Sequence, residues 1–129
     1  MIIDDNLLNE VAAKAQASPR LRMNYNFHES PDSKAQRLLN ALEPGTVLPI
    51  HRHRHTAETY ILLRGKIVVN FYDDLGAQTA EFVLDPLAGR YGVQIPKGQW
   101  HTLVVVEPAV IFEVKDGPYM PISPEDMME

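Results

Sequence analysis

The sequence predicts a mainly β protein of one domain with a single short helix near its N-terminus. Two observations predict this class. Apolar residues follow a helical spacing only near the start of the chain, and the remainder alternates short branched or aromatic runs with turn signals. Many short strands at such spacing are typical of a β-sandwich or barrel. The length of 129 residues fits one domain, expected to span residues 1–129.

The helix is expected over about residues 4–17, which read "DDNLLNEVAAKAQA". Leu7, Val11 and Ala15 recur at the spacing that places side chains on one face of a helix. One of the acidic or amide residues that open this run can cap the first turn. The dipeptide Ser18-Pro19 should end the helix, because a residue before proline avoids the helical conformation.

The barrel is expected over about residues 20–115. Turn signals interrupt this region, among them "EPG" at 43–45, "DDLG" at 73–76 and "PKG" at 96–98. Runs such as "KIVVNF" and "TLVVV" are apolar on both faces, as in strands that are covered from two sides. The helix, a second sheet or a second subunit must supply this cover, which favours a homodimer. The proline-rich, acidic stretch 116–129 is expected to lie irregularly on the surface.

Composition and charge narrow the functional class. The formal net charge is −5, which argues against an electrostatic surface for nucleic acid or for an anionic membrane. No apolar run approaches the roughly 20 residues of a membrane-spanning helix, and the N-terminus lacks a secretory signal. There are 0 cysteines, which excludes disulfides and thiolate metal sites. We therefore expect a cytoplasmic protein whose partner is a small molecule.

Three of the 5 histidines occupy alternate positions within "GTVLPIHRHRHTAETYILLRG", residues 45–65. In an extended strand His51 and His53 point to one face, whereas Glu58 has the opposite parity. A bend at "RHTA", residues 54–57, would bring the carboxylate to the face of the imidazoles. We therefore expect a hairpin whose two arms place two imidazoles and one carboxylate at one point.

A third imidazole can come from either of two positions. His101 follows the turn "IPKGQW" and opens an apolar strand, whereas His28 ends a polar stripe. Three imidazoles and a carboxylate suit one divalent transition ion, namely Fe, Mn, Ni, Cu or Zn, better than Ca or Mg. His55 shares the histidine parity and would replace His53 as a ligand if the register of this strand slipped.

The segment "RLRMNYNFH", residues 20–28, alternates strictly between polar and apolar side chains. Arg22, Asn24, Asn26 and His28 share the polar face. This face either lies in water as part of an edge strand or lines the mouth of the barrel. In the second case Arg22 could clamp a carboxylate or a phosphate through two parallel hydrogen bonds.

Further side chains are candidates for contact with a substrate. Arg37 is a second basic candidate, and Trp100 is either a packing residue or a platform for a sugar ring. Tyr60 shares the expected face of Glu58, where it could donate a hydrogen bond, move a proton or simply pack in the core. Tyr60 and His28 are the residues that we expect to act in catalysis.

The spacing within residues 45–65 resembles the first signature motif of the cupin superfamily. The matching positions are Gly45, His51, His53, Glu58 and Gly65. This resemblance implies a double-stranded β-helix, or jelly-roll, barrel that holds a metal ion inside. The implied metal ligands are His51, His53, Glu58 and His101.

The second cupin motif is matched in part. Pro96, Gly98 and His101 fall in place, whereas Arg90 and Val105 stand where the family has glycine and asparagine. Four longer stretches are similar to the WbuC group of small cupin metalloproteins. They are "SPRLRMNYNFH" at 18–28, "QRLLNALEPGTVLPIHRHRH" at 36–55, "IPKGQWHTLV" at 95–104 and "FEVKDGPY" at 112–119. That group is associated with bacterial O-antigen gene clusters.

Three functional hypotheses follow from these residues. The first is a metal-dependent enzyme, an isomerase, epimerase or oxygenase, acting on a small sugar-related or anionic oxygenated substrate. The second is a non-catalytic metallated module that binds a sugar or a small acid. The third is a structural cupin whose metal only ties strands together. Open metal positions facing a polar pocket favour the first two, and a closed metal site inside an apolar plug favours the third.

Overall fold

The computed structural model describes residues 1–128 and is built mainly of β-strands. The predicted mainly β class with one short N-terminal helix is confirmed. Its elements in chain order are α1 (Asp5–Ala17), β1 (Arg22–Asn26), β2 (Ala35–Leu42), β3 (Glu58–Tyr72), β4 (Gln78–Leu84), η1 (Pro86–Ala88), β5 (Gly92–Ile95), β6 (Trp100–Asp116) and η2 (Pro124–Asp126). Among residues 1–128, no helix combines the length and the apolar character that a membrane crossing requires.

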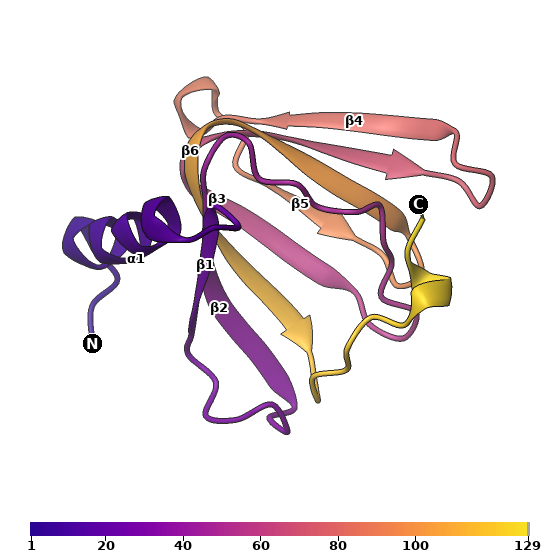
Figure 1. The fold of residues 1–129 in the computed structure, drawn as a ribbon, viewed down its shortest axis with the longest axis horizontal. Helices are drawn as coiled ribbons and strands as arrows, with labels where there is room; N and C mark the ends of the chain where they lie inside the picture. Colours follow the sequence, from indigo (N-terminus) through magenta and orange to yellow (C-terminus); the bar gives the residue numbers. More distant parts are fainter. Residues whose placement is uncertain (129) are drawn as a thin grey trace.

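Two long antiparallel strands, β3 and β6, form the centre of the fold. Along the sheet the strands follow the order β1-β2-β6-β3-β4, and β5 pairs with β3 as well. The first part of β3 pairs with β5 and with the end of β6, whereas its second part pairs with β4 and with the start of β6. Figure 1 shows the result as two layers that open away from each other toward one side.

The bend between the layers lies at Gly65 and Pro108. The β3–β6 register shifts between Leu62 and Ile67, which interrupts the ladder at this point. Gly65 has a φ of 88°, and a Cβ at this position would collide with the Pro108 carbonyl group. Only glycine allows both the backbone conformation and this close approach.

Two apolar cores result from the bent sheet. The first lies between the two layers and includes Leu62, Ile67, Ile95 and Ile111. The second lies where α1 covers the outer face of β2 and β6. Its buried residues are Leu7, Leu8, Val11, Ala15, Leu39, Ala41 and Val110. The helix therefore supplies part of the cover that the two-sided apolar strands require.

The helix begins and ends where local chemistry favours it. The Asp4 carboxylate accepts a hydrogen bond from the Leu7 backbone N–H at 3.1 Å, so it caps the first turn. Ser18 takes an extended conformation after the last turn, as its position before Pro19 predicts.

The C-terminal stretch has little regular structure and lies largely at the surface, but backbone hydrogen bonds hold it against the barrel. Residues 117–128, here called the C-terminal strap, include η2 and return to the histidine segment. The Arg52 N–H donates to the Asp126 carbonyl at 3.0 Å, and the Met128 N–H donates to the Ile50 carbonyl at 2.8 Å. Periodicity could not reveal this contact, because the strap pairs with residues more than seventy positions away.

We expect Gly65→Ala to lower the free energy of unfolding by about 3 kcal/mol or more, because backbone strain of about 1–2 kcal/mol adds to a backbone collision. Gly89→Ala is the matched control: its φ is also positive, at 75°, but a Cβ there would meet nothing within 4 Å. Urea unfolding followed by circular dichroism measures both. Equal losses would show that the approach to Pro108 does not matter.

Candidate metal centre

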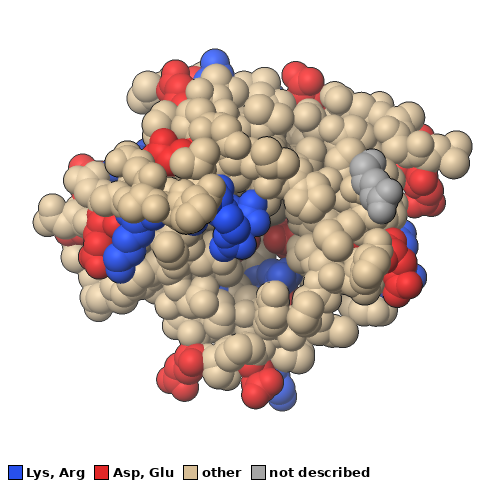
Figure 2. Space-filling model, viewed as in Figure 1, with Lys and Arg blue, Asp and Glu red and all other residues tan. Residues whose placement is uncertain are grey.

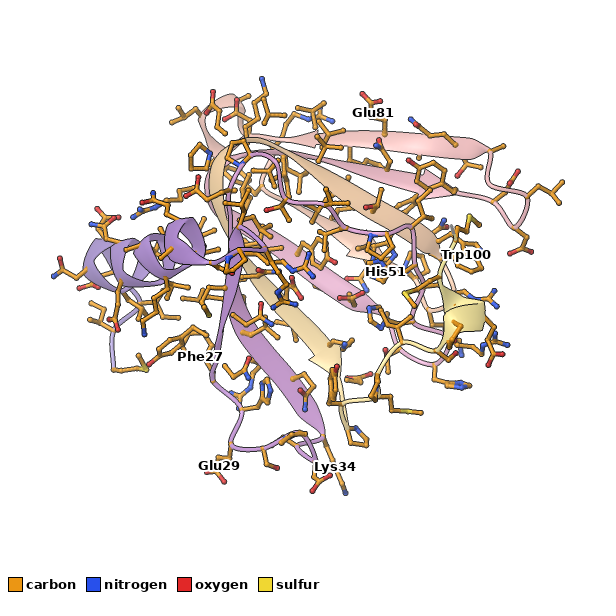
Figure 3. The ribbon with its side chains drawn as sticks, in the orientation of Figure 1. Phe27, Glu29, Lys34, His51, Glu81 and Trp100 are labelled. Atoms are coloured by element: carbon orange, nitrogen blue, oxygen red, sulfur yellow. The ribbon has the colours of Figure 1, made fainter. Side chains whose placement is uncertain are left out.

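Four side chains from separate segments meet between the layers of the barrel. His51, His53, Glu58 and His101 each offer one ligand atom, and these atoms all lie within 4.8 Å of one another. We call this set the His/Glu cluster. The two histidines of the loop precede β3, Glu58 opens β3, and His101 is the second residue of β6. Figure 3 shows the labelled His51 between the two layers.

Glu58 is the common partner within the cluster. Its Oε1 atom lies 2.9 Å from His53 Nε2 and 3.4 Å from His101 Nε2. The His51 ring packs beside the others, with its centroid 4.3 Å from that of His101 and 5.3 Å from that of His53. The imidazoles therefore surround one small volume beside the carboxylate.

Backbone pairing sets the position of the histidine segment. The His51 N–H donates to the His101 carbonyl at 3.0 Å, and the His101 N–H donates to the His51 carbonyl at 2.8 Å. The predicted hairpin between the histidine arm and the Glu58 arm was wrong in its pairing. His51 pairs with β6 and the strap, whereas the start of β3 pairs with β5 and the end of β6. Among the described residues, the histidine segment and the start of β3 therefore converge at the cluster without pairing with each other.

Backbone carbonyl groups orient two of the imidazoles. His51 Nδ1 lies 2.9 Å from the Pro49 carbonyl oxygen, and His101 Nδ1 lies 2.8 Å from that of Gln99. Because a carbonyl oxygen can only accept, a ring nitrogen this close to it carries the proton and donates a hydrogen bond. The Nε2 atoms are then left with a free lone pair directed into the cluster, as a metal ligand requires.

Electrostatics keep the cluster in a form that binds cations. Burial and the neighbouring His101 lower the pKa of His51 to about 4, so its imidazole is neutral at pH 7. Burial alone would raise the pKa of Glu58, but the approach of His101 and His53 outweighs it and lowers that pKa. The cluster thus offers a neutral His51 imidazole and an ionised carboxylate.

The buried atoms of the cluster fit a divalent transition metal. Within residues 1–128, Glu58 Oε1 and His101 Nε2 are buried and have no hydrogen bond of acceptable geometry. Leaving such atoms unsatisfied costs about 1–3 kcal/mol each. A cation shared by these atoms would satisfy them together, and a mixed nitrogen and oxygen ligand set suits Fe, Mn, Ni, Cu or Zn.

The two other histidines lie outside the cluster. His55 is exposed on the loop before β3 and lines a cavity of about 330 Å³ under the C-terminal strap. His28 follows β1, and its Nδ1 atom lies 3.1 Å from both the backbone N and the carbonyl oxygen of Arg37. The structure therefore brings His101, and not His28, to the other ligands.

The polar stripe of β1 lies on the inner face of the sheet. Asn24 is directly opposite Asn40 in the ladder, and both sit across the sheet from the face that α1 covers. Asn26 shares this face, and both β1 asparagines are exposed at its rim. Arg22 Nη1 donates to the Val47 carbonyl at 3.0 Å. Its guanidinium is therefore held at the mouth of the barrel.

Two predicted substrate contacts lie elsewhere. Arg37 has the parity of Leu39 on β2, so it points to the outer face and is exposed. The face of the Trp100 ring is covered, because the Arg52 guanidinium carbon lies 4.4 Å from its centroid. Trp100 Nε1 also donates to Asp74 Oδ1 at 3.0 Å. Trp100 is therefore a packing residue in this structure, and its ring face is not open to a sugar.

Arg52 ties three segments together behind the cluster. It stands between the ligands His51 and His53, and its side chain stacks on Trp100, the residue before His101. Its Nε atom donates to Asp126 Oδ1 of the strap at 2.8 Å, and Arg54 Nη2 donates to the same oxygen at 2.8 Å. These hydrogen bonds, that of Arg54 first, hold the pKa of Asp126 well below its usual range.

The sequence did not point to three residues that the structure places around the cluster. Asp126 closes the strap, and Asn40 and Glu113 meet on the inner face, where Asn40 Nδ2 donates to Glu113 Oε1 at 2.9 Å. Burial, and then the charge of Glu58, raise the pKa of Glu113 to about 7. The sequence signal that could have identified Glu113 is an acidic residue at an inward-facing position of an otherwise apolar strand.

A family model described as a domain of unknown function, DUF6016, matches residues 3–84. The chain belongs to the DUF6016 family. The match covers the helix, the cupin-like histidine segment and β3, but it ends before β5 and β6, so it includes His51, His53 and Glu58 and not His101. No curated protein matches the sequence of this DUF6016 chain.

Solved structures show the fold of this DUF6016 protein. The capsular polysaccharide assembling protein CapF from Staphylococcus aureus is 22% identical, with a TM-score of 0.61 over 81% of this chain and 28% of CapF. TT1209 from Thermus thermophilus is 24% identical, with a TM-score of 0.63 over 90% of this chain and 97% of that one. A cupin superfamily protein from Desulfitobacterium hafniense is 15% identical, with a TM-score of 0.59 over 74% and 76%.

These likenesses confirm the predicted cupin fold. At such identities they show the fold alone. The DUF6016 chain spans less than a third of the length of CapF, so it corresponds to one part of that protein.

We expect Asp126→Asn to loosen the strap, because the amide cannot hold both arginines as the carboxylate does. The backbone N–H groups of Arg52 and Met128 should exchange with solvent about tenfold faster, which hydrogen-exchange mass spectrometry or NMR measures. Glu125→Gln is the control, since among residues 1–128 its carboxylate accepts a hydrogen bond from the Ser123 hydroxyl alone, at 3.3 Å. Unchanged exchange in Asp126→Asn would show that the backbone contacts alone hold the strap.

Glu113→Gln should change how stability depends on pH. The pKa of Glu113 is raised in the fold, so its contribution to stability is complete below about pH 4.5 and is lost as pH rises toward about 7. In EDTA, the melting temperature of Glu113→Gln relative to the natural chain should rise by about 4 °C between pH 5 and pH 8.

Glu58, Tyr60, Lys115, Asn40 and His101 surround Glu113 and are present in both proteins, so the comparison isolates this carboxyl group. Glu81→Gln, on the exposed side of β4, is the control (Figure 3). A difference that does not depend on pH would contradict the raised pKa.

Proposed function

We propose that this DUF6016 protein binds one divalent transition metal, Fe, Mn, Ni, Cu or Zn, and acts as an enzyme on a small sugar-related or anionic oxygenated compound. One observation carries the proposal: the ligand atoms of His51, His53, Glu58 and His101 converge, and within residues 1–128 Glu58 Oε1 and His101 Nε2 are buried without a hydrogen-bond partner. Three imidazoles beside one carboxylate form a ligand set for a cation and have little other use in a core.

The residues of the cluster have distinct roles in this proposal. When bound, the metal supplies Lewis-acid polarisation of a substrate oxygen or activation of a bound water. The Nδ1–H groups of His51 and His101 donate hydrogen bonds to the carbonyl oxygens of Pro49 and Gln99. Their Nε2 atoms are therefore free to bind the metal. Glu58 supplies the negative charge. The barrel wall excludes bulk water from the protein side, because Glu58 and His101 are 3% and 1% exposed.

The substrate class rests on the surroundings of the cluster. Asn24, Asn26 and Arg22 on β1 lie on the inner face of the sheet. Figure 2 shows a hollow in the middle of this view of the molecule, with basic and acidic atoms in and around it. The likeness to CapF, described as a capsular polysaccharide assembling protein, supports a sugar-related compound. The resemblance to the WbuC group supports a role in O-antigen or polysaccharide metabolism.

A non-catalytic binding module is the second candidate, and the positions of the predicted catalytic residues favour it. Tyr60 is only 5% exposed and belongs to the core between the layers. His28 is engaged with the backbone of Arg37. Turnover of sugar nucleotides with and without a chelator separates the two candidates, because a binding module would consume nothing.

The assembly and location of the protein stay predictions. Apolar side chains remain exposed on the outer sides of β3 and β6, which supports a homodimer. They are Ile61, Leu63, Val104 and Val106. A single domain over residues 1–129, a cytoplasmic location, and a small molecule as partner, with no nucleic acid or membrane, are the corresponding proposals.

Removing a cluster side chain should abolish metal binding. Protein purified without a histidine tag should contain about one metal ion per chain by plasma mass spectrometry. His51→Ala, His53→Ala, His101→Ala and Glu58→Gln should each lose it, because three ligands leave a buried cation poorly held.

His55→Ala is the matched control for His53→Ala, since both histidines lie on the same short segment and His55 is exposed outside the cluster. It should keep the full metal content. Metal that is lost in His55→Ala and retained in His53→Ala would contradict this ligand set.

A further inference from the structure

A second polar group lies on the inner face of the barrel beside the His/Glu cluster. Asn40 on β2 and Glu113 on β6 are joined by the 2.9 Å hydrogen bond between Nδ2 and Oε1. Glu113 is directly opposite Tyr60 in the β3–β6 ladder, and Tyr60 lies two positions along β3 from Glu58. These three residues, Asn40, Glu113 and Tyr60, are here called the inner polar row.

The row leads from the mouth of the barrel to the proposed metal site. β2, β6 and β3 are consecutive in the sheet, so the row crosses two strand spacings, about 10 Å. Its far end reaches the cluster, since the centroids of Tyr60 and His101 are 6.4 Å apart. Its near end is continued by Asn24, which is exposed and directly opposite Asn40.

The row contains unused hydrogen-bonding capacity. Asn40 Oδ1 is buried and has no hydrogen-bond partner within residues 1–128. The Asn40 side-chain amide donates a hydrogen bond to Glu113 through Nδ2, and its Oδ1 atom can still accept one from another group. Buried polar atoms in folded proteins are nearly always satisfied, by protein, water or ligand. An unpaired amide oxygen on the wall of a polar interior is therefore a feature that a ligand would use.

The chemistry of the row favours hydroxyl groups. Amides, a carboxyl group and a phenol can both donate and accept hydrogen bonds, as a hydroxyl group does. An anionic group would bind weakly at the row, because Glu113 is itself acidic. The nearby guanidinium of Arg22 already donates a hydrogen bond to the Val47 carbonyl.

We infer that the inner polar row is a recognition site for the hydroxyl groups of a polyhydroxylated carboxylic acid, whose carboxylate end reaches the His/Glu cluster. This inference rests on the proposed metal site. It adds Asn40 and Glu113 as binding residues and makes the hydroxyl-bearing end of the ligand the part that the protein distinguishes.

The test compares two acids on manganese-loaded protein by calorimetry. D-Gluconate carries a carboxylate, an adjacent hydroxyl and a chain of further hydroxyls. Glycolate keeps only the carboxylate and the adjacent hydroxyl. The natural chain should bind gluconate about tenfold or more tightly than glycolate, because only gluconate reaches the row.

Variants assign the preference to the row. Asn40→Leu and Glu113→Leu should weaken gluconate binding by about five- to thirtyfold and leave glycolate binding unchanged. Glu113→Gln should retain the preference, since its amide still donates and accepts. Asn70→Leu is the matched control, because Asn70 also has a buried oxygen without a partner but lies on the second half of β3.

Only variants that keep their manganese content and circular dichroism spectrum are compared, and Asn40→Ser serves if Asn40→Leu does not fold. Failure of the natural chain to take up manganese, and likewise iron, nickel, copper and zinc, would overturn the proposed function together with this inference. Manganese uptake with equal affinity for the two acids would overturn the inference alone. Equal weakening of both acids by Asn40→Leu would show a structural role for the row and overturn the inference as well.

Discussion

The bend in the β3–β6 ladder is the constraint on which the site depends. In the register of this ladder Glu58 pairs with Lys115, whereas His101 pairs with Phe71. Glu58 and Phe71 are separated by 71 − 58 = 13 positions, which in a flat sheet would hold the two ligands about 40 Å apart. In the structure their ligand atoms are 3.4 Å apart, because the ladder folds over at Gly65 and Pro108.

The same bend divides the interior into two chemically different regions. Near the fold of the ladder, apolar side chains such as Ile67 and Ile111 are completely buried. Toward the open side the layers diverge, and the inner polar row leads across β2, β6 and β3 to the cluster. The apolar region stabilises the barrel and fixes the distance between the two layers. The polar region can then be kept for binding without supporting the fold.

Local periodicity predicted much of this structure. The helix, the turn-rich strands and the convergence of His51 and His53 with Glu58 follow from spacings of a few residues. The spacing in β1 likewise showed which polar residues share a face, but left open whether that face points inward. The pairing of the histidine segment was mispredicted, since parity shows which side chains share a face but not which strand lies beside them. Arg37 was misplaced for a related reason: its chemistry resembled that of Arg22, but its parity on β2 is outward.

Contacts between distant segments could not be read from the sequence. Asn40 and Glu113 meet only through the β2–β6 register, and Asp126 reaches Arg52 only because the strap returns across the barrel. His101 was one of two candidates until the ladder placed it beside Glu58.

The path of the strap also bears on how the protein is handled. Figure 1 shows the N-terminus and the C-terminal strap on opposite sides of the molecule, and the strap pairs with His51 beside the start of β6. Met128 is hydrogen-bonded to Ile50, the residue before His51, so a peptide fused at this end of the chain would begin close to the His/Glu cluster. A purification tag of histidines there would bring competing ligands to the ion, whereas one fused ahead of the helix would begin far from it.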